Sequence, residues 1–262
     1  MLIGVCQTDI IQGDKKYNLI TAEDYILKCA AKGASLVLFP ELSMTGFVED
    51  ADTVAETKEH NETIETIAGY SVKYNVAVGC GFVYKDETGA FTNHYAIVDN
   101  AGKVICDYTK IHPFSLSSES KVYEGGSEVK TFTLEGITFA PFICYDLRFP
   151  EIFRAVCDKA QVIIVPANWP AIRDGHWRRL LAARALENQC YVIGINRVGN
   201  DKDGIYIGDS CLMDSEGDII DMLEANEPGI MIVDVDYDSV MDFRSELPAI
   251  KDRKPKLYKT LF

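Results

Sequence analysis

The sequence predicts an α/β protein with a mixed β-sheet and helices packed outside it. Strand-like and helix-like stretches alternate in the first 75 residues and again toward the end of the chain, with hairpin-like pairs in the middle. Such alternation is typical of sheets covered by helices. No Gly/Ser-rich linker, repeat or low-complexity segment divides the chain, so we expect one domain over residues 1–262.

The expected strands are short apolar runs. Residues 34–39 are almost wholly apolar, which is typical of a strand buried on both faces. Turn sequences at 86–89 and 100–103 indicate antiparallel pairs on either side of them. The full set of expected strands is 2–8, 34–39, 76–84, 91–99, 104–108, 129–134, 137–142, 161–165, 191–195, 206–214, 218–222 and 230–236.

The expected helices carry recognisable start and stop signals. Asp14 can cap the first helix and Gly33 can close it in the left-handed conformation. Pro150 suits a first helical turn because its φ is already fixed near the helical value. Residues 111–126 show no clear period and are expected to form a long loop over the sheet edge. The expected helices are 17–32, one ending near 74, 150–159, 174–188 and a short one at 240–244.

Charge and cysteine content restrict the partners and the compartment. Forty acidic against 26 basic residues give a net charge of −14, which argues against nucleic acid and anionic membranes as partners. The eight cysteines are scattered in apolar stretches without a C-x-x-C pair, and no secretory signal is visible. No apolar run approaches the roughly 18 residues of a membrane span. We therefore expect a cytoplasmic protein with reduced thiols.

Cys144 stands at a strand-to-helix corner. The apolar run 136–143 ends at this cysteine, polar residues follow, and Pro150 opens the next helix. Backbone N–H groups at such a corner have no helical acceptor, so they favour a thiolate and can bind a developing oxyanion. The alternative is a buried structural cysteine, because free cysteine is among the most buried residue types.

Three other polar residues also follow apolar strands. Glu41, Lys110 and Asn168 come directly after the runs 34–39, 104–108 and 161–165 or within a few residues of them. Ligands in α/β sheets gather beyond the carboxyl ends of strands, so these side chains are expected to share one pocket with Cys144. The alternatives are that Glu41 is a loop residue or helix cap and that Lys110 is a solvated charge.

Together these residue types could perform nucleophilic catalysis. Glu41 could take the thiol proton, and Lys110 could hold Cys144 as a thiolate and then stabilise an oxyanion, with the N–H of Tyr145 as a second donor. The chain has no G-x-G-x-x-G, P-loop or G-x-S-x-G motif and no metal-ligand spacing, so we expect no cofactor and no metal. A Cys–His pair using His112 or His176 is an alternative that no local pattern supports.

Three segments resemble the catalytic blocks of the nitrilase superfamily of carbon–nitrogen hydrolases. They are Phe-Pro-Glu at 39–41, Tyr-Thr-Lys-Ile-His at 108–112 and Ile-Cys-Tyr-Asp-Leu-Arg-Phe-Pro-Glu at 143–151, in the family's order. Residues 177–189 and the strand end at 196–199 also look like the family, so the similarity covers nearly the whole chain.

The resemblance implies a fold and a set of roles. The fold would be a single-domain four-layer α-β-β-α sandwich, assembled into homodimers or higher homo-oligomers by stacking of helices. Glu41 would be the general base, Lys110 the oxyanion stabiliser and Cys144 the nucleophile of a thioester mechanism. Glu119 falls where many members have a second glutamate that helps to position the catalytic groups.

The Cys144 block, together with Ala-Asn-Trp-Pro at 167–170, looks most like the omega-amidases, which cleave the terminal amide of 2-oxoglutaramate or 2-oxosuccinamate. Such substrates carry a carboxylate, which Arg148 or Arg173 could bind; equally, either arginine could belong to a structural ion pair. Asn168 and Trp169 are further candidates for substrate contact, and Trp169 could instead simply fill core.

Two other functions stay open. One is hydrolysis of a carbamoyl amide or a nitrile by the same superfamily chemistry. The other is a catalytically silent protein that binds a small molecule on this fold. The intact Glu41, Lys110 and Cys144 argue against silence, because a buried charged cluster is costly to retain without a use.

Overall fold

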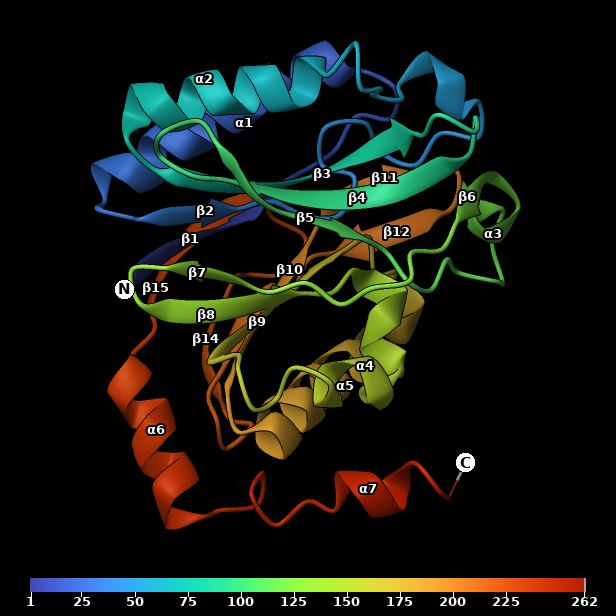
Figure 1. The fold of residues 1–262 in the computed structure, drawn as a ribbon. Helices are drawn as coiled ribbons and strands as arrows, with labels where there is room; N and C mark the ends of the chain where they lie inside the picture. The colour runs from blue at the N-terminus through green and yellow to red at the C-terminus, as the bar shows by residue number, and fades with distance from the viewer. Residues whose placement is uncertain (262) are drawn as a thin grey trace.

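The computed structural model describes residues 1–261, which form two stacked β-sheets with helices on both outer faces (Figure 1). Helices α1 (Lys15–Ala31) and α2 (Glu62–Tyr74) cover one sheet, whereas α4 (Pro150–Arg154) and α5 (Asp174–Asn188) cover the other. This α-β-β-α order confirms the predicted fold class. In the same part of the chain, no helix is both long enough and apolar enough to cross a membrane.

The first sheet is mixed. Strands β1, β2 and β3 run parallel, and β3, β4 and β5 continue the sheet in antiparallel fashion. In spatial order its strands are β15 (Gly229–Asp234), β1 (Leu2–Gln7), β2 (Leu36–Leu38), β3 (Ala77–Lys85), β4 (Phe91–Val98) and β5 (Val104–Thr109), with β6 (Tyr123–Glu124) paired to β4. Because β4 is antiparallel to both β3 and β5, β5 runs in the same direction as β2. Both strands therefore end at the same edge of this sheet.

The second sheet has a parallel centre formed by β8, β9 and β10. Its order is β14 (Ile219–Met222), β13 (Cys211–Met213), β10 (Tyr191–Asn196), β9 (Val162–Ala167), β8 (Ile137–Pro141) and β7 (Phe132–Leu134). A single apolar cluster joins the two sheets and includes Ile3 and Leu36 of the first and Ile163 and Ile193 of the second, all fully buried. Burial of these facing side chains holds the layers together.

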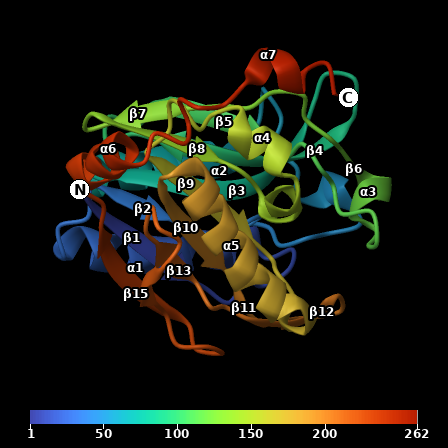
Figure 2. The same cartoon turned by 90° about the horizontal axis from the view of Figure 1, so that it is seen from below.

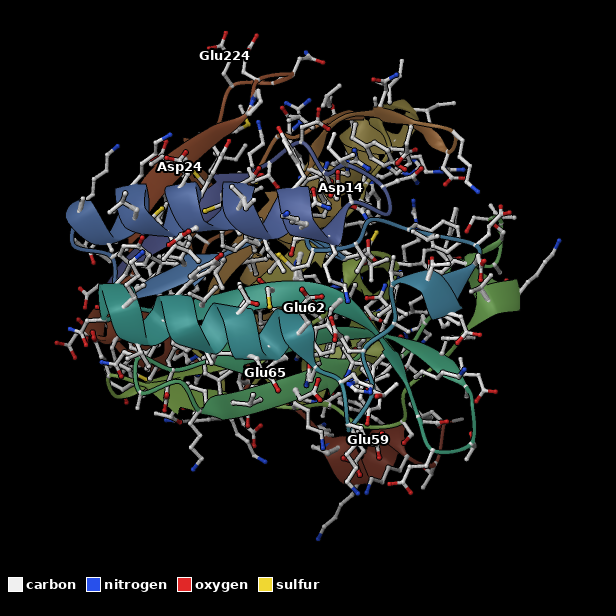
Figure 3. All side chains as sticks on the ribbon, turned by 90° about the horizontal axis from the view of Figure 1, so that it is seen from above. Asp14, Asp24, Glu59, Glu62, Glu65 and Glu224 are labelled. Atoms are coloured by element: carbon white, nitrogen blue, oxygen red, sulfur yellow. The ribbon has the colours of Figure 1, made fainter. Side chains whose placement is uncertain are left out.

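The helix-end signals read from the sequence are in place. The Asp14 side chain accepts a hydrogen bond from Tyr17 N at 3.0 Å, which caps α1, and Gly33 follows that helix with φ of +85°. Helices α1 and α2 lie side by side on the sheet, and Glu62 and Glu65 stand in the first turn of α2 (Figure 3). Their charges interact favourably with the positive end of the helix dipole.

Several expected elements differ from the structure. The expected strand 206–214 is two strands, β12 (Gly204–Ile207) and β13, because Gly208 and Asp209 both have positive φ and turn the chain between them. Strand β12 instead pairs with β11 (Val198–Asp201), a polar segment that the sequence pattern did not reveal. The helix expected over 150–159 ends at Arg154, and residues 155–159 form turns.

Short elements were also missed. The expected loop 111–126 contains α3 (Glu119–Val122) as well as β6. The short helix at 240–244 is longer, as α6 (Tyr237–Glu246), and the tail beyond it carries α7 (Pro255–Tyr258). In Figure 1, α7 lies below the layer of α4 and α5, and α6 lies to one side of that layer; seen from below in Figure 2, both lie toward the margin of the molecule while α5 crosses its middle. Single turns of 3₁₀ helix complete the elements: η1 (Ala51–Thr53), η2 (Cys144–Arg148) and η3 (Ala171–Arg173).

The turn after β2 lies directly against β3 at Gly81. A Cβ atom at this glycine would sit 2.2 Å from the backbone N of Leu42 and 3.0 Å from the carbonyl carbon of Glu41. Gly81 N also donates to Ser43 Oγ at 3.1 Å, and its carbonyl accepts from Met44 N at 3.2 Å. The absence of a side chain at Gly81 therefore allows β3 to support the turn that carries Glu41.

We predict that Gly81→Ala lowers the free energy of unfolding by about 1–3 kcal/mol, because the new methyl group must displace backbone rather than a flexible side chain. Chemical denaturation measures this change. Gly69→Ala is the matched control: a methyl group added at this exposed glycine in α2 would have no atom within 4 Å, and the change should stabilise the helix by about 0.5–1 kcal/mol. Equal effects of the two substitutions would contradict the prediction.

Candidate active site

One pocket collects the polar residues that follow the strands of both sheets. Glu41 lies in the turn after β2, Lys110 directly after β5, and Cys144 at the start of η2, shortly after β8. Together with Glu119 of α3 these residues line a pocket of about 710 Å³. The expectation that they share a pocket is therefore confirmed, and the pocket lies where the two sheets meet.

Lys110 is the centre of the polar cluster. Its side chain is 1% exposed, and its Nζ donates to Glu41 Oε1 and to Glu119 Oε1, each at 2.7 Å. Both are short, charge-assisted hydrogen bonds. An ammonium group has three N–H donors, so one remains for another acceptor. The reading of Lys110 as a solvated charge is wrong.

Backbone and amide groups fix both carboxylates. Glu41 Oε1 also accepts from Asn93 Nδ2 at 2.8 Å, and Glu41 Oε2 accepts from the N–H of Asn168 at 2.8 Å. Glu119 Oε2 accepts from the N–H of Phe114 at 2.9 Å. Asn93 was not identified from the sequence; the only signal was an asparagine inside an expected strand, where this residue type is depleted.

Cys144 opens into the pocket from a sharp turn. It is partly exposed, whereas the other seven cysteines are buried. Its φ is +46°, a left-handed conformation that is uncommon for a residue other than glycine. The turn directs the chain away from β8 at Cys144, so this residue lines the pocket, whereas the other seven cysteines are buried.

The electrostatics of the cluster favour the protonated thiol of Cys144. Burial, reinforced by the charge of Glu41, raises the pKa of Cys144 well above its usual 9.0, and Lys110 only partly opposes this rise. Burial also opposes the charge on Lys110, but Glu119 and Glu41 outweigh it and raise the Lys110 pKa. This rise opposes the expected thiolate at Cys144, because the charge of Lys110 is already shared between two carboxylates.

Burial likewise raises the pKa of Glu41 above its usual 4.5, with Lys110 opposing and Glu119 reinforcing the rise. A raised pKa keeps a carboxylic acid protonated to a higher pH. As the pH falls, Glu41 therefore becomes protonated, and can no longer accept a proton, at a pH above 4.5.

Two arginines line the pocket away from this cluster. The Arg148 guanidinium lies 4.7 Å from the centre of the Trp169 ring, and that of Arg173 lies 5.4 Å from the centre of the Phe114 ring. Within residues 1–261 neither arginine forms a salt bridge, so the reading of either as a structural ion pair is wrong for the described chain. The Arg148 guanidinium approaches the Nδ1 of His176, at 3.4 Å.

Asn168 and Trp169 both line the pocket, as expected. Trp169 is 3% exposed and packs against Trp177 at 5.5 Å between ring centres, so it both fills core and walls the pocket. Its Nε1 donates to the carbonyl of Arg173 at 2.8 Å. This bond attaches η3, and with it Arg173, to the end of β9.

No histidine lines the pocket in the part of the chain that the structure describes. His112 instead bonds to Asp146, and its ring stacks on Phe149 at 3.8 Å between centres. The Cys–His alternative is therefore wrong. Over the same residues, no group of three or more histidine, cysteine, aspartate or glutamate side chains is arranged to hold a metal ion.

We predict that the resting protein carries a neutral Cys144 thiol. The difference in ultraviolet thiolate absorbance between the native protein and Cys144→Ala should stay flat up to about pH 9, because burial and Glu41 hold the pKa of this thiol above its usual 9.0. The seven buried cysteines are common to both proteins and cancel. A step in the difference spectrum near neutral pH would contradict this result.

Comparisons with known proteins agree on one family. Residues 2–245 match the family model described as "Carbon-nitrogen hydrolase". The chain is 33% identical over 258 residues to the "2-oxoglutaramate amidase" of Bacillus subtilis, covering 98% of each chain. It is 34% identical over 220 residues to "Omega-amidase YafV" of Yersinia enterocolitica, covering 83% of each.

A solved structure extends this agreement to the fold. Saccharomyces cerevisiae Nit3, described as "a member of branch 10 of the nitrilase superfamily", superposes with a TM-score of 0.88 at 25% identity. The superposition covers 97% of this chain and 96% of that one. The likeness therefore takes in both sheets and the pocket between them.

Proposed function

The chain belongs to the carbon–nitrogen hydrolase family, and from that premise we propose that it hydrolyses the terminal amide of a small carboxylic acid monoamide through a Cys144 thioester. The observation that carries this proposal is the pair of hydrogen bonds from Lys110 Nζ to Glu41 and to Glu119, each at 2.7 Å, beside the partly exposed Cys144. This arrangement supplies a base, a cation and a nucleophile in one pocket.

The first half of the reaction forms the thioester. Glu41 takes the Cys144 thiol proton as Sγ attacks the amide carbon, so the thiolate need not exist beforehand. The carbonyl electron pair moves to oxygen, and the remaining N–H of Lys110, with the N–H of Tyr145, stabilises the resulting oxyanion. As the carbon–nitrogen bond breaks, the proton passes from Glu41 to nitrogen and ammonia leaves.

The second half frees the acid. Glu41, again a carboxylate, takes a proton from a water molecule, and the oxygen attacks the thioester carbon. The carbon–sulfur bond then breaks and the proton returns to Sγ, which restores the neutral thiol. One amide and one water give one carboxylic acid and one ammonia. Glu119 keeps Lys110 in place throughout, because its Oε2 is fixed by the N–H of Phe114.

The substrate class rests on the two arginines. A monoamide of a dicarboxylic acid has a carboxylate at the end opposite its amide, and in residues 1–261 Arg148 and Arg173 are cations without a salt bridge on the same pocket. An arginine fork suits a carboxylate because it can donate two parallel hydrogen bonds. The names of the Bacillus and Yersinia relatives, 2-oxoglutaramate amidase and omega-amidase, point to the same class.

We predict that Cys144→Ala abolishes ammonia release from 2-oxoglutaramate and that Glu41→Gln lowers kcat by roughly 10²–10⁴-fold through loss of the base. Glu151→Gln, at an exposed glutamate outside the pocket, is the matched control and should retain the native rate. Full turnover by Cys144→Ala would disprove the thioester mechanism. Carbon dioxide release from carbamoyl amides would indicate the carbamoyl alternative, and an unreactive site that still binds these compounds would indicate a silent binding protein.

We predict that Arg148→Gln or Arg173→Gln raises KM for 2-oxoglutaramate by roughly 10-fold or more, as expected when one charged hydrogen bond is lost. The KM for butyramide, which has no carboxylate, should change little. Arg179→Gln, at an exposed arginine outside the pocket, serves as the control. If both pocket variants affect the two substrates equally, the carboxylate is bound elsewhere or is not recognised.

A further inference from the structure

Asp146 is a buried carboxylate that the proposed chemistry does not use. It is the third residue of η2 and is fully buried, and it does not line the pocket. In residues 1–261 no lysine or arginine lies within salt-bridge distance of it; its charged or chargeable partner is His112. A buried carboxylate without a cation must be stabilised by hydrogen bonds, and Asp146 accepts four of them.

One of these bonds closes the turn around Cys144. Asp146 Oδ2 accepts from the N–H of Ile143 at 3.0 Å, while the Asp146 N–H donates to the carbonyl of Ile143 at 3.0 Å. Cys144 lies between these two residues and has the left-handed φ of +46°. Such a conformation persists only where its surroundings enforce it. The two bonds between Ile143 and Asp146 provide that constraint.

The other three bonds reach the segment that carries Lys110. Tyr108 donates its hydroxyl to Asp146 Oδ2 at 2.7 Å. His112 donates its backbone N–H to Oδ1 at 3.0 Å, and its ring Nδ1 lies 2.8 Å from the same oxygen. These two residues stand two positions before and two positions after Lys110, so Asp146 holds both sides of it.

We propose that Asp146 is a positioning residue that fixes the Lys110 segment of the first sheet against the Cys144 turn of the second. The inference rests on the proposed amide hydrolysis for its catalytic consequence, and its structural part is independent of that reaction. Only an ionised carboxylate offers enough acceptor sites for four donors. The amide group of an asparagine would instead point its own N–H donors at groups that now donate to Asp146. Asp146 contacts no reacting atom; it acts by holding Lys110 and Cys144 in place.

The test combines turnover with chemical labelling. Asp146→Asn should lower kcat roughly 10- to 100-fold, as expected for a misplaced catalytic group, while KM stays within about twofold. Iodoacetamide alkylation of Cys144, followed by peptide mass spectrometry, should accelerate with pH as Glu41 ionises. The low-pH part of this rate profile, in which alkylation accelerates, is called the acidic limb. In Asp146→Asn the acidic limb should move to higher pH, because Lys110 lowers the pKa of Glu41 and would no longer be held beside it.

Two further variants keep the test decisive. Tyr108→Phe removes one bond to Asp146 with little change in shape and should move kcat and the alkylation limb in the same direction, even if Asp146→Asn folds poorly. Asp107→Asn is the matched control, since Asp107 pairs with His94 Nδ1 at 2.7 Å on the same strand but makes no bond to η2; it should leave both readouts unchanged.

An unchanged acidic limb in folded Asp146→Asn or Tyr108→Phe would overturn the inference, even if the melting temperature fell, because a purely structural role lowers stability without moving the limb. Equal shifts in Asp107→Asn would overturn it as well. If the native protein releases ammonia from none of the amides, the proposed function fails, but the alkylation profile still decides the role of Asp146.

Discussion

The site depends on one buried ammonium shared by two carboxylates. Glu41 and Glu119 each place a carboxylate oxygen 2.7 Å from Lys110 Nζ, so the ammonium offsets the repulsion between the two carboxylates. Conversely, a lone buried lysine would lose its proton or move to solvent, and loss of one partner of such a group typically costs about 3–5 kcal/mol. The Lys110 cluster is therefore stable only as a whole, and its three members come from the end of β5, the turn after β2 and α3.

In the proposed mechanism, the same cluster favours a neutral thiol at Cys144. Beside two carboxyl groups and one ammonium, Cys144 would add a further negative charge to the cluster if it ionised at rest. In the proposed reaction, proton transfer to Glu41 during attack avoids that state, because the negative charge moves from Glu41 to the developing oxyanion rather than accumulating on sulfur. Lys110 would stay beside that charge in every proposed step, so it would need no rearrangement between the two halves of the reaction.

Much of this site could be predicted because its residues break a local rule. Glu41, Lys110 and Cys144 are conspicuous at the ends of apolar strands, and their meeting follows from sheet topology. Features that depend on distant pairs were not accessible: Asn93 and Asp146 act through partners far away in sequence, and nothing near either residue identifies those partners. The pKa of Cys144 depends on its tertiary burial and on how Lys110 divides its charge, and neither can be read from the local pattern at the strand-to-helix corner.

The pocket changes character from base to rim, which bears on how the proposed substrate would enter. The base holds the buried Lys110 cluster, whereas the rim carries Leu116, Ile172 and Ile205, which are 77%, 87% and 63% exposed. Arg148 and Arg173 lie on the same pocket over aromatic rings, with no salt bridge in the described chain. A carboxylate entering first would meet Glu41 and Glu119 and be repelled. An amide entering first would meet the N–H of Lys110 that has no acceptor among residues 1–261, and its carboxylate would be left to the arginines. The two carboxylates at the base and the two arginines therefore favour the amide-inward orientation that the proposed chemistry needs, although Asp201 and Asp203 line the pocket as well.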